Sequence, residues 1–561
     1  MTSPAGAAPN QGTPAQDTGA RDTGAQDTAA QETSAPGTPA PGIPAPGTPT
    51  TGSPTFWDAV QIRRVSHQVA DLLADYLTRL PDGPAYQPPP RGLVEAMRAA
   101  EWAEQGEPAD AVLAEFTAHV APYPFGNGHP AFAAWVNSPP HPLGVLAEAL
   151  AAAMDPSVAG GNHAAVHLEH QVIRWFADLL GWPGGYSGQL VSGGSAATLT
   201  ALAVARHRAA ARAGTDDRRH GLAGLAGRLV LYTGTESHSC VTKAAEVLGL
   251  GSASIQVVPS DPDHQMRPDE LERLVLADQA AGKLAVAVVA TAGTANTGAI
   301  DPLSEIAGVC ARYGIWLHVD GAYGVPPILL LDRYQTVRDG LARADSLAVD
   351  AHKWLYAPVD AGLVLLRDGA AARDTFSLVP PYLRTDGDED GPGGPVWFSE
   401  YGLEQTRPFR ALKVWMQLRH LGRDGYRRLI AADLATAGEL QRAIEASSDF
   451  ELLASGLSVV CFRHRPAGMD PARLDSAGLD RAGLDRADLD RADLDRADLD
   501  RHNRAVLRAV QLGGRAFLAG TTVDGVFALR ACIVNPGLTA ARVPGLLREI
   551  RDRAAELLSA G

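Results

Sequence analysis

The chain has 561 residues and a formal net charge of −15 at neutral pH. This length is too great for one small core, so two or three structural units are expected. The acidic balance argues against nonspecific nucleic-acid binding and against attachment to anionic membranes. The cysteines stand far apart without metal-site spacing, which predicts reduced thiols in a cytoplasmic protein: Cys240, Cys310, Cys461 and Cys532.

Residues 1–55 consist largely of Pro, Gly, Ala, Thr and Ser with scattered acids. Such a segment cannot bury enough apolar surface to offset its chain entropy, so we predict a disordered tail. No basic stretch followed by an apolar run marks a signal peptide. The longest apolar run, residues 284–292, is too short to span a bilayer, which predicts a soluble protein.

Residues 56–138 are predicted to form a helical N-terminal arm. Their apolar side chains recur at spacings of three and four residues, as in Val65, Val69, Leu72, Leu73 and Tyr76. Because the segment has no strand signal, we expect the arm to pack on something else, such as a second subunit.

Residues 139–410 alternate helical and strand patterns, which predicts a large α/β domain. Runs of Val, Leu, Ala and Ile imply strands buried on both faces, and hence a mainly parallel sheet between helices. Ligands of such sheets bind at the carboxyl ends of the strands. Strands are expected at residues 189–191, 229–232, 254–258, 284–291, 315–319 and 346–349.

Residues 411–561 are predicted to form a small α+β C-terminal domain. Its helices are expected at 411–421 and 542–558, and its strands at 457–463 and 526–533. Within it, residues 470–501 repeat Leu-Asp-Arg-Ala-Asp. In a helix, successive leucines of this repeat would be rotated by about 140°, so no apolar stripe would form. The segment is also too short for a stacked pentapeptide β-helix, which favours a mobile insertion.

Lys353 and Asp320 each follow a predicted buried strand. A lysine amine forms a Schiff base with the aldehyde of pyridoxal phosphate, and a carboxylate keeps the pyridine nitrogen protonated so that the ring accepts electrons. A buried carboxylate is costly unless paired, and a pyridinium is a suitable partner. Asp320 alone is equally typical of a helix cap, but the pair predicts a pyridoxal phosphate enzyme.

The segment Ser192-Gly193-Gly194-Ser195 joins a strand to a helix. Glycines there let the backbone approach an anion, so Gly194 and Ser195 are candidate phosphate ligands, although Gly and Ser are also common caps. His238 follows another strand, where an imidazole can stack on a flat cofactor ring. Further candidate cofactor contacts are Ala322, Thr294, Ser346, Asp350 and His352.

The order of phosphate loop, His, a Thr/Gly turn at residues 291–295, Asp and Lys resembles the pyridoxal-dependent group II decarboxylases, which include aromatic-L-amino-acid, histidine and glutamate decarboxylases. Residues 129–132, 406–413 and 527–530 also match. The resemblance covers residues 57–561 apart from the repeats.

This resemblance implies a fold-type I architecture and a homodimer with the active site at the subunit interface. It implies that Lys353 binds the cofactor, that Asp320 pairs with the pyridinium and that His238 stacks on the ring. Gly194, Ser195, Ser346 and Asp350 would surround the phosphate. Tyr382 would protonate the carbanion left by carbon dioxide, and the substrate would meet Trp135, Asn137, Ser138 and His238.

The chain departs from aromatic family members at Val136, Asn137 and Asn127, where bulkier or apolar groups are usual, and at Ala295, where a threonine is common. We expect decarboxylation of an L-amino acid to its amine, with aromatic substrates slightly favoured. 2,4-Diaminobutyrate, acidic amino acids and oxidative aldehyde synthesis remain alternatives. Outside this class, an aminotransferase, a cysteine desulfurase-like lyase and a scaffold without enzymatic activity are the competing hypotheses.

Overall fold

The computed structural model describes residues 57–126, 128–379, 391, 394–465 and 486–560. The chain divides into two compact units, residues 1–64 and residues 65–561. Helix α1 (Ala59–Arg79) crosses the boundary between them. The predicted tail, residues 1–55, lies outside the described residues.

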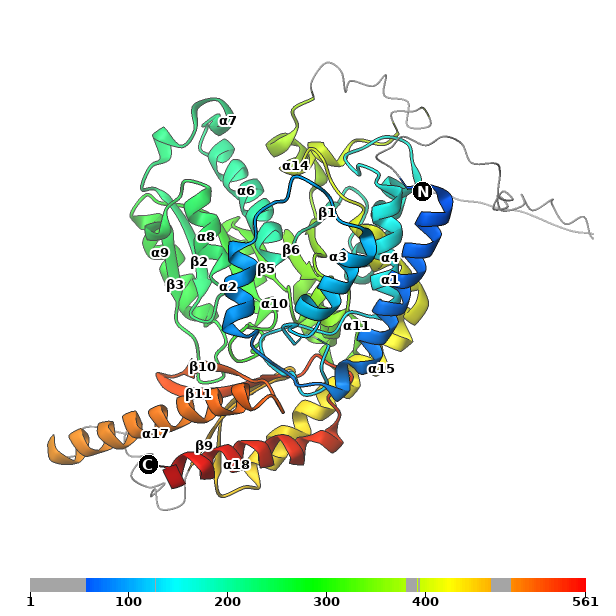
Figure 1. Cartoon of the computed structure of the whole chain (residues 1–561). Coiled ribbons are helices and arrows are strands. Elements are labelled where there is room, and N and C mark those ends of the chain that lie inside the picture. The colour runs from blue at the N-terminus through cyan, green and yellow to red at the C-terminus, as the bar shows by residue number, and fades with distance from the viewer. Residues whose placement is uncertain (1–56, 127, 380–390, 392–393, 466–485, 561) are drawn as a thin grey trace, which may run out of the picture. The chain divides into compact units, whose positions relative to one another are not determined.

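The large sheet has seven strands in the order β1-β7-β6-β5-β4-β2-β3 (Figure 1). Its strands are β1 (Ser187–Val191), β2 (Leu229–Gly234), β3 (Ile255–Val258), β4 (Leu284–Thr291), β5 (Trp316–Asp320), β6 (Ser346–Asp350) and β7 (Gly362–Leu366). Every strand predicted for this domain is present, and the mainly parallel sheet is confirmed.

Strand β7 was not predicted, and it runs antiparallel to both of its neighbours, β1 and β6. The connection from β6 to β7 holds only the short helix α13 (Ala351–Trp354). A parallel crossover needs a dozen residues or more, so this short connection returns the chain in the opposite direction.

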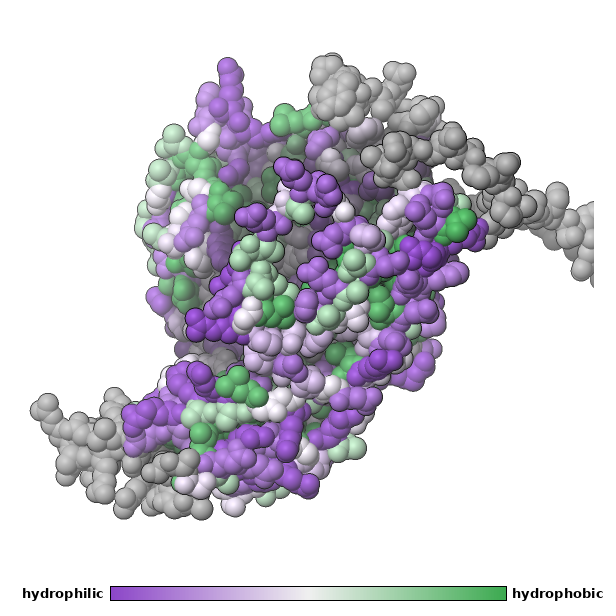
Figure 2. All heavy atoms as spheres, viewed as in Figure 1, coloured by the Kyte–Doolittle hydropathy of each residue, from purple (hydrophilic) through white to green (hydrophobic). Residues whose placement is uncertain are grey.

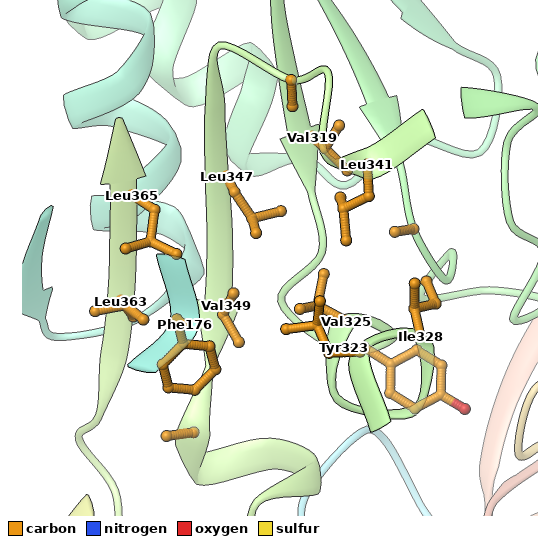
Figure 3. Packing of buried hydrophobic residues seen from close by; sticks show 14 of the residues in the cluster. Phe176, Val319, Tyr323, Val325, Ile328, Leu341, Leu347, Val349, Leu363 and Leu365 are labelled. Carbon is orange, nitrogen blue, oxygen red and sulfur yellow. The ribbon is translucent and has the colours of Figure 1, made fainter. Parts of the chain in front are cut away.

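Both faces of the large sheet are buried, as the apolar runs predicted. In β7, Leu363 and Leu365 join one apolar cluster, while Val364 and Leu366 join the cluster on the other face. Figure 3 shows the first cluster, where Phe176 approaches the side chains of β6 and β7. Helices α5 (Ala164–Leu180), α9 (Pro268–Ala280), α10 (Leu303–Tyr313), α11 (Val325–Leu330) and α12 (Gln335–Leu341) contribute to that cluster, whereas α6 (Gly194–Arg212), α8 (Cys240–Val247) and α14 (Gly369–Phe376) contribute to the other.

The small sheet has four antiparallel strands in the order β10-β11-β9-β8. Strands β9 (Val459–His464) and β11 (Val526–Cys532) were predicted, whereas β8 (Phe450–Gly456) and β10 (Ala519–Val523) were not. Asp524 and Gly525 join β10 to β11 with φ angles of 48° and 75°. Two positive φ values in a two-residue loop are typical of a type I′ hairpin, so Asp-Gly was an available signal.

Helices α15 (Arg410–Glu445), α17 (Arg486–Gly513) and α18 (Val543–Ala560) pack with this small sheet (Figure 1). Residues 486–501 of the repeats form the first part of α17, which corrects the prediction of a separate mobile insertion there. Leu499 is fully buried, and Val506 and Val510 continue its apolar face toward the sheet. The apolar stripe therefore combines Leu499 of the repeats with residues that follow them.

Residues 65–138 contain the rest of α1, then α2 (Arg91–Ala99) and α3 (Ala109–Glu115), with no strand among the described residues. Helix α4 (Pro142–Met154) follows, and α7 (Asp217–His220) lies later in the chain. The division into arm, large domain and small domain stays a prediction. On the face drawn in Figure 2, hydrophilic and hydrophobic residues are interspersed. No described helix combines the length and apolar character that a membrane crossing requires.

Candidate active site

The carboxyl ends of the parallel strands meet at a cavity of about 330 Å³. Asp320 is the last residue of β5, Ser192 follows β1, and Lys353 lies in α13, directly after β6. The predicted residues that line this cavity are Gly194, Ser195, His238, Asp320, Ala322, Asp350, His352 and Lys353. Segments predicted separately along the chain therefore form one site.

Lys353 is placed at the cavity wall with a carboxylate beside its amine. Its Nζ lies 3.0 Å from Oδ2 of Asp350. Burial disfavours the charged amine, but Asp350 and then Asp320 outweigh this effect and raise the pKa of Lys353 above its ordinary value. The two carboxylates therefore stabilise the charged form of the Lys353 amine.

Glycines form a cradle at the start of helix α6. A Cβ on Gly194 would lie 3.0 Å from Cβ of Ala322 and 3.1 Å from Oδ2 of Asp350. On the other side of the loop, a Cβ on Gly362 of β7 would lie 2.4 Å from Cα of Gly193. The first amides of a helix have no intrahelical acceptor, so a phosphate fits this cradle.

Asp350 lies beside the cradle, but an ionised carboxylate accepts hydrogen bonds and does not donate them. Its Oδ2 pairs with Lys353, and its Oδ1 has no hydrogen-bond partner among the described residues. Nε2 of His352 lies 3.7 Å from Asp350, and Nδ1 of His352 accepts from the amide of Ala361 at 3.1 Å. Asp350 therefore pairs with Lys353 in this structure, and its place in the phosphate environment stays a prediction.

Asp320 is buried, and few hydrogen-bond donors of the protein approach its carboxylate. Its Oδ1 accepts from the amide of Ala322 at 3.2 Å, and its Oδ2 lies 3.8 Å from Sγ of Cys240. Burial and Asp320 raise the pKa of Cys240 to about 12, so this thiol keeps its proton at neutral pH. A thiol is a weak donor, which leaves Asp320 suited to pair with a protonated ring nitrogen.

His238 is exposed and lines the cavity. Its Nδ1 accepts from the amide of Cys240 at 3.2 Å. This hydrogen bond fixes the plane of the ring and leaves the proton of the neutral imidazole on Nε2. The position agrees with the predicted stacking role.

Ser346 and Thr294 do not line the described cavity, and their contacts with the cofactor stay predictions. Ser346 begins β6 while Asp350 ends it, and four residues of strand separate them by roughly 13 Å. The Ser346 hydroxyl accepts from Nε1 of Trp316 at 2.7 Å. The Thr294 hydroxyl is used within its own turn, where it contacts Thr297 at 2.9 Å.

Of the predicted substrate residues, His238 lines the cavity, whereas Trp135, Asn137 and Ser138 are not in its wall. Val136 lines the cavity between Trp135 and Asn137 in the sequence. Oγ of Ser138 donates to the carbonyl of His352 at 3.2 Å, so Ser138 holds the lysine segment. The ring of Trp135 lies 4.9 Å from that of Phe125, centre to centre. Tyr382 and Asn127 lie outside the described residues.

Other cavity residues were not predicted as site residues. Thr291 ends β4 as Asp320 ends β5, so the rule that ligands bind at carboxyl ends would have found it. Val136, Cys240 and Tyr323 also line the cavity. Their apolar or weakly polar side chains carry no comparable sequence signal.

Arg530 is the functional candidate that lies farthest along the chain. It is buried in β11, where Nε donates to the carbonyl of Asn296 at 3.0 Å and Nη1 donates to the carbonyl of Trp135 at 3.2 Å. Within the described part of the chain, Nη2 has no hydrogen-bond partner. Asn296 and Trp135 are each adjacent in sequence to a cavity residue, Ala295 and Val136 respectively, so this guanidinium lies close to the cavity.

Asp433 of α15 anchors the segment that carries the lysine. Its Oδ2 accepts from Nε1 of Trp354 at 2.9 Å and from the hydroxyl of Tyr356 at 2.7 Å. The ring of Trp354 stacks on that of Tyr323 at 5.0 Å, centre to centre. Burial raises the pKa of Asp433 to about 7. The short helix that holds Lys353 and the residues directly after it are thus fixed from two sides.

A sequence model of the pyridoxal-dependent decarboxylase conserved domain matches residues 92–465. The chain belongs to the pyridoxal-dependent decarboxylase family. This membership confirms the resemblance seen in the sequence, the predicted amino-acid decarboxylase and its cofactor, pyridoxal phosphate. It also decides against the aminotransferase, desulfurase-like and scaffold hypotheses.

This decarboxylase is 29% identical to the aromatic-L-amino-acid decarboxylase of Bacillus atrophaeus, over 89% of the chain and 96% of that protein. It is 32% identical to a tyrosine decarboxylase of Oryza sativa subsp. japonica, over 73% of the chain and 77% of that protein. The crystal structure of Oryza sativa TDC with PLP and tryptamine matches with a TM-score of 0.78 and 27% identity, over 90% of the chain and all of that structure. The predicted fold-type I architecture is therefore confirmed.

Proposed function

We propose that this decarboxylase acts on an aromatic L-amino acid, releases carbon dioxide and forms the corresponding amine. Its similarity to an aromatic-L-amino-acid decarboxylase over 89% of the chain is the observation that carries the substrate class. Phe125 and Trp135 support it, because they leave nearly half of their surfaces exposed beside Val136 at the cavity. Exposed rings at a cavity favour contact with a flat apolar side chain.

Pyridoxal phosphate, when bound, supplies an electron sink for the pair of electrons left by the departing carbon dioxide. The chain contributes the groups that position this chemistry. The glycine cradle at Gly194 holds the phosphate, and Asp320 keeps a proton on the ring nitrogen. Lys353 supplies the amine that tethers the cofactor, and His238 covers the ring.

We propose that Arg530 binds the carboxylate of the substrate. Its guanidinium is buried and held by two backbone carbonyls, which offset none of its full charge. Nη2 is buried and unpartnered within the described residues, so a carboxylate that reaches it would pair with an uncompensated charge. A charge-assisted bond from a fixed fork would set the orientation of the substrate relative to the ring.

We propose further that the protein is a homodimer in the cytoplasm, with the active site at the subunit interface. Several large apolar side chains between residues 65 and 125 are exposed, and such surfaces commonly meet a partner. They are Val69, Met97, Trp102, Val112 and Phe116. The four cysteines are free and buried, which agrees with the predicted reduced thiols. Tyr382 remains our candidate for returning a proton to the reacting carbon.

The test is a panel of L-amino acids incubated with the purified, cofactor-loaded protein, with amine, carbon dioxide, aldehyde and peroxide measured separately. We expect kcat/KM for an aromatic member to exceed that for glutamate and 2,4-diaminobutyrate by at least about tenfold, or ~1.4 kcal/mol. A preference for either of the latter two would contradict the substrate class. Borohydride reduction followed by peptide mapping should mark Lys353.

Aldehyde synthesis is the second candidate, because a 4-hydroxyphenylacetaldehyde synthase of Rhodiola rosea is 26% identical over 90% of the chain. Aldehyde, ammonia and peroxide in place of amine would favour it. Tyr382→Phe separates the two reactions. If Tyr382 returns the proton, this variant should lose amine formation while it still takes up pyridoxal phosphate.

A further inference from the structure

A second cavity, of about 280 Å³, lies at the end of the large sheet opposite the active site. Trp316 begins β5, and Asp345 precedes the first residue of β6. Strand β7 runs antiparallel, so its last residue and the following Arg367 lie at the same edge. The catalytic residues lie at the other ends of these strands, so the second cavity is separate from the active site.

Four arginines line this cavity: Arg208, Arg212, Arg343 and Arg367. The lining holds a single carboxylate, Asp345, and both of its oxygens are already used. Oδ1 lies 2.6 Å from Nη2 of Arg367, and Oδ2 accepts from the amide of Leu317 at 2.9 Å. One of the four positive charges is therefore compensated within the cavity, in a chain whose net charge is −15.

The other three guanidinium groups are paired weakly or with neutral acceptors. Arg212 donates to the carbonyl of Ala285 at 3.1 Å, and Arg343 donates to the carbonyl of Ser304 at 3.0 Å. A carbonyl satisfies an N–H group but does not neutralise a charge. Arg208 lies 3.6 Å from Asp368, and both side chains are half exposed, so solvent screens this pair.

Arg208 is also placed to present its charge to the cavity. Its guanidinium lies over the ring of Trp316, 5.6 Å from the ring centre. Burial and the neighbouring Arg208 both lower the pKa of Arg212, which reflects repulsion between the two groups. An anion between them would relieve this repulsion.

We propose that this cavity binds a compact anion with at least two negative charges, carried by phosphate or carboxylate groups. Guanidinium forks match the geometry of both groups, and the volume is at the lower end of the range for small-molecule sites. Arg208 and Arg212 lie in the last turns of α6, whose first residue is Gly194 of the phosphate cradle. The occupant would thus contact the same helix that begins at the active site.

The test is isothermal titration calorimetry on the full-length, cofactor-loaded protein with pyrophosphate, citrate and acetate at matched ionic strength. We expect one site per chain for at least one of the two polyanions, with Kd below about 1 mM, and no comparable heat with acetate. The pyrophosphate and citrate titrations distinguish a phosphate-bearing from a carboxylate-bearing ligand. Equal heats from all three anions would overturn the proposal, as would no binding at several millimolar.

Arg208→Gln and Arg343→Gln should each weaken polyanion binding by about tenfold or more, since each removes a charged donor. Arg333→Gln is the matched control, because Arg333 also lies over an aromatic ring, that of Tyr334 at 4.9 Å, but outside this cavity. It should leave Kd unchanged. If the polyanion still binds to both cavity variants, or if it changes the absorbance of the bound cofactor, the anion binds elsewhere and the proposed site is wrong.

Discussion

Nζ of Lys353 lies 3.0 Å from Oδ2 of Asp350, three residues earlier in the chain. The same oxygen borders the glycine cradle, where a Cβ on Gly194 would approach it to 3.1 Å. One carboxylate thus lies between the lysine and the phosphate site. It stabilises the charged amine and, by its own charge, opposes an approaching phosphate.

Asp350→Asn should make Lys353 react with pyridoxal phosphate at lower pH. Asp350 is the largest of the effects that raise the pKa of Lys353, and without it the opposing effect of burial gains weight. The pH midpoint for cofactor capture by the apoenzyme should fall by about 1–3 pH units. Stopped-flow absorbance measures this midpoint over a pH range that extends above the ordinary lysine pKa of 10.5. Asp424→Asn, which alters an exposed partner of Arg427, should leave it unchanged.

Asp320→Asn should bind the cofactor but turn over slowly, because an amide does not stabilise a proton on the ring nitrogen. We expect kcat to fall by at least about 100-fold, or ~2.7 kcal/mol. Reconstitution with the N-methylated cofactor, whose nitrogen carries a fixed positive charge, should restore part of this loss. Equal activity of the variant with both cofactors would argue that Asp320 acts in some other way.

Arg530→Gln should weaken binding of the substrate more than binding of the product. The amino acid carries the carboxylate that we assign to Arg530, and the amine product does not. We expect kcat/KM to fall by on the order of 100-fold, whereas the affinity for the amine stays within about twofold. Steady-state kinetics and spectral titration with the amine measure the two quantities. A parallel loss of both would indicate a structural role.

Asp433→Asn should change how stability depends on pH. The pKa of Asp433 is about 7 in the folded protein against 3.8 as its ordinary value. The folded state therefore binds this proton more tightly, so the contribution of Asp433 to stability falls as pH rises from about 4 to 7. Asparagine does not titrate. Between pH 5 and pH 8, the free energy of unfolding of the variant should therefore rise by about 2 kcal/mol relative to that of the parent. Urea unfolding at the two pH values measures it.

A second substitution at this position separates charge from hydrogen bonding. Asp433→Leu removes the acceptor of both Trp354 and Tyr356. It should destabilise the protein by about 2–5 kcal/mol at pH 5, because two buried donors lose their partner, and by less at pH 8, where the parent no longer has the stability of the protonated carboxyl. If neither variant gains stability relative to the parent between pH 5 and pH 8, the titration of Asp433 does not contribute.

Much of the fold could be predicted from local pattern, because buried parallel strands such as β4 and β5 are continuous apolar runs. Strand β7 is equally apolar, but a short run does not show its direction, and it was left unassigned. Strand β10 was missed because its middle residues are not buried, and the Asp-Gly turn after it carried the stronger signal. The end of the repeats folds as helix because Leu499 and later residues together supply an apolar face.

The site was predictable where a residue ends a parallel strand, since those ends share one edge of the sheet. Asp320 and Lys353 were found in this way. For Ser346, nearness to Lys353 in sequence did not reveal that it begins the strand and does not line the described cavity. Arg530 was missed because its position depends on contacts with Trp135 and Asn296, which are distant in the chain.

Gly362 has a consequence for protein engineering. Gly362 does not line the cavity. A Cβ at this position would nevertheless lie 2.4 Å from Cα of Gly193 and would shift the phosphate cradle. Libraries that aim at new substrates can therefore vary Val136, whose side chain faces the cavity, while Gly362 stays fixed. A survey restricted to ligand-contacting positions would overlook this second kind of constraint.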